Sequence, residues 1–124
     1  MATTTATISA TTTATMSSYF SITAHYVMAQ NNHFDMDYYL ANHLPLIEKF
    51  DPECLVRIDV QAVYDEHQPN RLAAVLAAYV YPDEEAFNRS IAMIETPCLA
   101  DVKNFTDVAS TVYVGPCKSF VYCS

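Results

Sequence analysis

His43 is the side chain in this sequence best suited to proton transfer. It lies in a segment that predicts a helix, Asp35 to Phe50, and shares one helical face with Tyr39, four residues before it. A face of this kind packs against a core, so we expect the imidazole inside the protein among apolar and aromatic groups. Burial disfavours the charged imidazolium and leaves a neutral ring that accepts a proton near neutral pH.

A neutral histidine beside a tyrosine hydroxyl is equipped to move a proton at a carbon next to a carbonyl. The alternative is structural: a buried His43 that only bonds to a backbone carbonyl near Pro45. Asp35 has the structural role of an N-cap, and it would orient a substrate hydroxyl if the first helical turn borders a pocket. His25 lies on the polar face of its predicted strand, where it either lines a dimer interface or is exposed.

The composition excludes several classes of partner. The net charge is −8 at pH 7 and the six basic residues form no patch, which argues against nucleic acid and anionic membranes. No histidine pair has metal-site spacing and the four cysteines form no CxxC pair, so we expect no metal site. The sequence shows neither a secretory signal nor a membrane-spanning run, so we expect a cytoplasmic protein with free thiols.

The chain divides into a tail and one domain. Residues 1–18 are almost entirely Thr, Ala and Ser, which predicts a tail outside a domain of residues 19–124. Because threonine favours extended structure, the tail would alternatively add a strand to an exposed sheet edge.

Hydrophobic periodicity predicts four strands and two helices. The strands are expected at residues 19–28, 55–64, 72–81 and 109–114, the last ended by Gly115-Pro116. The first helix is expected to kink or break at Pro45, and the second to run from Pro82-Asp83 to Thr96-Pro97, with a short helical piece after it. The order β-α-β-β-α-β predicts an α+β, ferredoxin-like fold. Its uncovered sheet face predicts a homodimer that packs sheet against sheet.

Two motifs add a family resemblance. The segment from Phe34-Asp35 through Tyr38-Tyr39 to His43-Leu-Pro45-Leu46 resembles the FDxxYY…HxPL signature of the EthD family, in the dimeric α+β barrel superfamily. The segment Asp101 to Asp107, with Asn104-Phe105, is similar to that family's NFTD-type turn. The resemblance covers about residues 19–116 and implies a sheet-to-sheet dimer with a pocket between sheet and helices in each subunit. Many relatives place a second histidine near position 78, where this chain has Ala78.

Relatives in this superfamily include polyketide cyclases, dehydratases, decarboxylases and lactone isomerases of secondary metabolism, mostly without a cofactor. The leading hypothesis is therefore a cofactor-independent lyase or isomerase with no cofactor, acting on a small hydrophobic oxygenated metabolite such as an aromatic polyketide or a lactone. Its reaction would be a dehydration, decarboxylation, cyclisation or isomerisation. The alternatives are an ancillary protein that binds a hydrophobic metabolite without turnover, and a cofactor-free monooxygenase. The expected catalytic residues are His43 and Tyr39, and the expected substrate contacts are Asp35, Tyr79, Tyr81, His25, Asn104 and Phe105.

Overall fold

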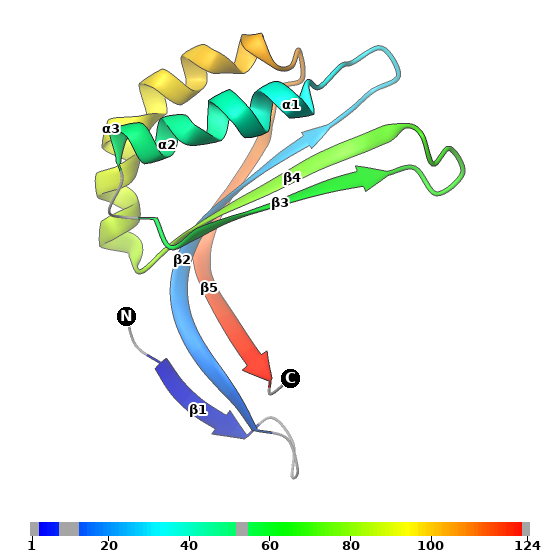
Figure 1. Ribbon diagram of the computed structural model, residues 1–124. Helices are drawn as coiled ribbons and strands as arrows, with labels where there is room; N and C mark the ends of the chain where they lie inside the picture. The colour runs from blue at the N-terminus through cyan, green and yellow to red at the C-terminus, as the bar shows by residue number, and fades with distance from the viewer. Residues whose placement is uncertain (1–2, 8–12, 52–54, 123–124) are drawn as a thin grey trace.

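Helices cover one face of an antiparallel sheet in the computed structural model, which describes residues 3–7, 13–51 and 55–122 (Figure 1). The strands are β1 (Thr3–Thr7), β2 (Thr13–Val27), β3 (Arg57–Tyr64), β4 (Leu72–Tyr81) and β5 (Thr111–Tyr122). The helical segments are α1 (Met36–Tyr38), the π-helical turn η1 (Tyr39–His43), α2 (Leu44–Phe50), α3 (Glu84–Asp101) and the 3₁₀ turn η2 (Val102–Asn104).

The main sheet has the strand order β5-β2-β4-β3, and every neighbouring pair in it is antiparallel. The segment α1–α2 follows β2, α3 follows β4, and both lie on the same side of the sheet (Figure 1). This is the ferredoxin-like arrangement, so the predicted α+β fold is confirmed. Within the described residues, no helix is long and apolar enough to cross a membrane.

The core lies between the helices and the sheet. Tyr26 of β2 pairs with Val75 of β4, and their side chains are 4% and 0% exposed on the helix-facing side. Thr23 and His25, at alternating positions of β2, lie on the opposite face, as the strand period of two requires. We refer to this opposite face as the open face.

An arm extends the sheet beyond the part that the helices cover. It consists of β1, residues 13–19 of β2 and residues 116–122 of β5 (Figure 1). In the arm β2 pairs with β1 on one side and with β5 on the other. Residues 3–7 thus form the added strand that the threonine content suggested as an alternative, and β2 begins at Thr13 rather than at residue 19. Ala14 and Ser17 are buried in this extension of β2.

Two expected breaks at prolines are wrong. The helix predicted to end at Thr96-Pro97 continues through Pro97 to Asp101, because Cys98 and Val102 beyond it pack against the core and hold the last turns in place. The strand predicted to end at Gly115-Pro116 continues to Tyr122. Among the described strands β5 pairs with β2 alone, so it is an edge strand, where a proline need not interrupt the ladder.

The first helix changes its geometry just before Pro45, where a kink or break was expected. Regular α-helix gives way to the π-helical turn at Tyr39–His43, and Pro45 follows as the second residue of α2. The expected N-cap is confirmed, since Oδ1 of Asp35 accepts a hydrogen bond from the backbone N–H of Tyr38 at 3.0 Å. Phe34 packs against Tyr39, with ring centroids 5.1 Å apart.

The N-cap of α3 yields a stability prediction. Oδ1 of Asp83 accepts a hydrogen bond from the backbone N–H of Ala86 at 2.8 Å. We expect Asp83→Ala to lower the free energy of unfolding by about 1 kcal/mol, as measured by urea unfolding with an unchanged m-value. Asp83→Asn keeps a capping oxygen and is expected to lose much less. Equal losses in the two variants would contradict a capping role for Asp83.

Candidate functional site

A cavity of about 350 Å³ lies between the helix-facing side of the sheet and the helices. Its wall is mostly apolar, with a few hydroxyl, thiol, imidazole and carboxylate groups. The lining residues are Ile22, Ala24, Tyr26, His43, Ile47, Tyr79, Tyr81, Ile91, Ile94, Glu95, Cys98, Leu99, Val102, Ser110 and Val112. The helical layer, β2, β4 and β5 therefore all contribute to one site.

The π-helical turn explains how His43 reaches this cavity. In a regular α-helix, residues spaced four apart drift round the axis by about 40° at each step. The wider π turn reduces this drift, so Tyr39, His43 and Ile47 are all buried on the same face, at 0%, 3% and 2% exposure. The rings of Tyr39 and His43 stack at 18°, with centroids 5.3 Å apart.

Asp101, the last residue of α3, is the hydrogen-bonding partner of His43. Its Oδ2 lies 3.0 Å from Nδ1 of His43, and both side chains are largely buried. An ionised carboxylate only accepts hydrogen bonds, so Nδ1 carries the proton and Nε2 keeps a free lone pair. Among the described residues Nε2 has no partner, and the imidazole lines the cavity. His43 thus offers the cavity a neutral nitrogen that accepts a proton.

Asp101 is itself held in place by two further donors. Its Oδ1 accepts from the hydroxyl of Tyr38 at 2.7 Å and from Nδ2 of Asn104 at 2.8 Å. Burial raises the pKa of Asp101, but the hydrogen bonds from Asn104, Tyr38 and His43 together outweigh burial and hold that pKa below its ordinary value. The carboxylate is therefore an anion with a fixed orientation.

The protonation of His43 follows from its surroundings. Burial lowers its pKa, and the hydrogen bond and charge of Asp101 raise it by less, so the pKa of His43 lies below its ordinary value of 6.5. The ring is neutral at neutral pH. Phe105 packs edge-on against it at 4.5 Å between centroids and excludes water from that side.

Tyr39 and Tyr79 form a hydroxyl pair, with oxygens 2.8 Å apart. Tyr79 lines the cavity, whereas Tyr39 is fully buried behind it. Burial raises the pKa of Tyr39 and holds the pKa of Tyr79 well above its usual range, so both hydroxyls stay protonated. When Tyr39 donates to Tyr79, the proton of Tyr79 is left for a ligand oxygen.

The other predicted site residues fall into three groups. Tyr81 lines the cavity, but its hydroxyl bonds to Ser90 at 2.9 Å. Asn104 and Phe105 support the dyad from outside the cavity, as the donor to Asp101 and as the ring against His43. Asp35 is an exposed helix cap, and His25 lies on the open face against the ring of Tyr113. Neither of these last two residues is in the cavity wall.

Asp101 is the main site residue that sequence reasoning did not single out. The segment that resembles the NFTD-type turn begins with it, and that was the available signal. Position 78, near which the family resemblance implies a second histidine, lies on the open face in β4, opposite Thr23 and Asp59. A histidine there would not reach the cavity on the other side of the sheet. Asp101 occupies the position of partner to His43 instead.

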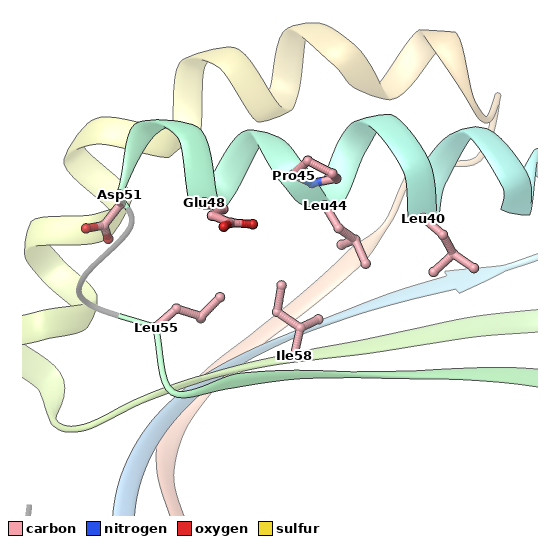
Figure 2. Close-up of a pocket in the computed structure, with 7 residues that line it drawn as sticks. All are labelled: Leu40, Leu44, Pro45, Glu48, Asp51, Leu55 and Ile58. Atoms are coloured by element: carbon pink, nitrogen blue, oxygen red, sulfur yellow. The ribbon is translucent and has the colours of Figure 1, made fainter.

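A second cavity, of about 340 Å³, lies between α2 and β3 (Figure 2). Leu40, Leu44, Pro45, Glu48, Asp51, Leu55 and Ile58 line it. Its acidic groups, Glu48 and Asp51, do not converge: Figure 2 shows the Asp51 carboxylate pointing away from the Glu48 side chain. Its described lining residues include no imidazole, thiol or phenol, whereas the cavity of His43 has all three. Within the described ranges, no three His, Cys, Asp or Glu side chains lie close enough together to hold a metal ion.

Burial of His43 predicts a pH dependence of stability. Because its pKa is lower in the folded than in the unfolded chain, the unfolded chain binds a proton first as the pH falls below about 6.5, and the folded chain loses stability. We expect His43→Gln to lose less stability than the wild type between neutral and mildly acidic pH, as measured by urea unfolding. His67→Gln, in the exposed turn after β3, is the control and is expected to behave like the wild type. An NMR titration of His43 with a midpoint above 6.5 would contradict this prediction.

Solved structures share the fold. An EthD-like protein from Ralstonia eutropha JMP134 is 20% identical, with a TM-score of 0.66 over 80% of this chain and 91% of that chain. An ethyl tert-butyl ether D (EthD) family protein from Bacillus halodurans C-125 is 17% identical, with a TM-score of 0.57 over 78% of this chain and 96% of that chain. No model of a known protein family and no curated protein matches the sequence. The resemblance read from the two motifs is thus supported by structure, and the chain has the fold of the EthD-like proteins.

Proposed function

We propose that this protein is a cofactor-independent lyase or isomerase that moves a proton on a small, hydrophobic, oxygenated metabolite, with His43 as the general acid/base. The observation that carries this proposal is the pair of His43 and Asp101, 3.0 Å apart at the edge of a mostly apolar cavity. The pair leaves Nε2 with a free lone pair. A positioned base of this kind typically accelerates proton transfer about 10²–10⁴-fold.

The proposed step begins when Nε2 of His43 takes a proton from a carbon next to a substrate carbonyl. The electron pair of the broken C–H bond moves into the carbonyl and gives an enolate, whose oxygen receives a hydrogen bond from Tyr79. Asp101 stabilises the imidazolium that forms. In an isomerisation the proton then returns to a different carbon, and in a dehydration it goes to the departing hydroxyl. In a cyclisation the enolate carbon attacks a second carbonyl, and the proton goes to the oxygen of that carbonyl.

The cavity suits a flat, mostly apolar substrate such as an aromatic polyketide or a lactone. Its aliphatic wall buries ring surface, which is the main source of affinity in such sites. Tyr79 supplies a hydroxyl to a substrate oxygen, whereas the bonded hydroxyl of Tyr81 leaves mainly its ring to contact a ligand. Exclusion of water protects an enolate from premature protonation.

Hydrogen–deuterium exchange tests the proposal without knowledge of the natural substrate. The probe is 2-tetralone, a bicyclic ketone with acidic hydrogens beside its carbonyl, incubated in D₂O and followed by mass spectrometry. We expect the wild type to exceed the buffer rate and His43→Gln to lose about 100-fold or more of that excess. His25→Gln, on the open face, is the matched control and is expected to exchange like the wild type.

Asp101→Asn separates positioning from mere packing in the same assay. The variant keeps the shape of the side chain but removes the charge that raises the pKa of His43, so the midpoint of the rate against pH moves to lower pH.

Binding of 2-tetralone without exchange by the wild type would support an ancillary binding protein instead. Oxygen consumption on a phenol would support a monooxygenase.

We also propose that the protein forms a homodimer through the open faces of its sheets. Tyr113 and Val121 are 59% and 63% exposed on that face, and packing two copies together would cover both. We expect sedimentation at twice the 13.9 kDa mass of one chain, and a shift toward the single chain in Val121→Asp. Gln68→Asp, in the exposed turn after β3, adds the same charge and is the control. A wild type that sediments as a single chain would contradict the dimer.

A further inference from the structure

We propose that the cavity selects its ligand by charge: it takes an uncharged oxygenated ring compound and rejects the corresponding carboxylate, with Glu95 at its mouth as the residue that sets this preference. This inference rests on the proposed function, because it assigns a substrate class to the same cavity. It follows from the charges that surround the cavity and from the side chains available to pair with a ligand.

No positive side chain lines the cavity within the described part of the chain. The nearest basic residue in sequence to the lining residues of α3 is Arg89, which forms an ion pair with Glu85 on an exposed part of that helix. Arg57 pairs with Asp59, and Arg71 with Asp65. None of the residues in the cavity wall therefore offers a guanidinium or ammonium to a ligand carboxylate.

The titratable groups in the wall are neutral or negative. Burial lowers the pKa of His43, raises the pKa of the Cys98 thiol to about 11 and holds the pKa of Tyr79 well above its usual range, so all three are uncharged at neutral pH. Glu95 is an exposed residue of α3 that lines the cavity, and it carries the remaining charge in the wall. Asp101, directly behind His43, is also an anion.

These groups treat an acid and a neutral ligand differently. A carboxylate that enters loses its water, finds no cation and approaches the negative charges of Glu95 and Asp101. A phenol loses far less hydration, and its hydroxyl donates to the lone pair of Nε2 on His43. A ketone loses equally little, and its oxygen accepts from Tyr79. The apolar wall contacts the hydrocarbon part of a charged and an uncharged ligand in the same way, so the difference in their affinity arises from charge.

The selection narrows the reaction. Loss of carbon dioxide from a free carboxylate requires an anionic substrate, and this cavity disfavours such a substrate. Dehydration, cyclisation and isomerisation of uncharged ketones, phenols and lactones remain. In these steps the substrate becomes an anion only as the enolate. The enolate forms together with the positive imidazolium of His43, so the net charge within the cavity does not change.

The test compares two probes with the same skeleton, 2-naphthol and 2-naphthoate, by calorimetric titration of the full chain at neutral pH. The naphthol is uncharged under these conditions and the naphthoate is an anion. We expect the naphthol to bind at least about tenfold more tightly, which corresponds to about 1.4 kcal/mol. Glu95→Gln is expected to narrow the ratio several-fold by strengthening naphthoate binding. Glu84→Gln, in the exposed first turn of the same helix, removes the same charge away from the cavity and is expected to keep the wild-type ratio.

Three outcomes would overturn the inference. The first is naphthoate binding as tightly as naphthol. The second is the same change of ratio in the Glu95 and Glu84 variants, which would assign selectivity to net charge rather than to the cavity mouth. The third is that neither probe binds at concentrations up to its solubility limit. That result would also contradict the proposed role of this cavity as the substrate site. Because binding is measured without turnover, a failed deuterium exchange with the expected binding ratio would overturn the proposed reaction alone.

Discussion

The hydrogen bond between Nδ1 of His43 and Oδ2 of Asp101 ties the first helical segment to the end of α3 above the sheet. The two side chains are only 4% and 12% exposed, so removal of either partner would leave a buried polar or charged group unsatisfied. The neighbouring residues satisfy this constraint. Tyr38 and Asn104 donate hydrogen bonds to the second carboxylate oxygen of Asp101, and Phe105 covers one side of the imidazole ring of His43. The pair therefore fixes the direction in which Nε2 faces the cavity.

Local sequence patterns predict most of the fold, and they predict one member of this pair, His43, but not the other, Asp101. Alternation along β2 and β4 identifies the helix-facing side, and helical spacing places Tyr39 and His43 on one inward face. Asp101 could not be found in this way, because it meets His43 across 58 positions of the chain and only the packing of α2 against α3 brings the two together. Spacing within one element carries no information about contacts of that kind.

The prolines show where tertiary structure overrides local preference. Pro97 and Pro116 both suggest an end, yet α3 and β5 continue past them. In each case the residues beyond the proline make contacts that keep the element going: Cys98 and Val102 pack on the core, and residues 117–122 pair with β2. Tertiary structure also decides the conformation of the threonine-rich residues 3–7, which form β1 because the extended β2 offers them an edge to pair with.

Burial underlies both the proposed reactivity and the proposed selectivity of the site. Removal of water keeps His43 neutral, so that Nε2 accepts a proton, and the same removal of water makes a ligand carboxylate costly. The two properties are coupled. A cation introduced into the wall to admit acidic ligands would repel the imidazolium and lower the pKa of His43 further, so the base would weaken as the range of ligands widened. The arrangement of a paired anion behind the ring and no cation in front of it keeps His43 as basic as an apolar cavity allows.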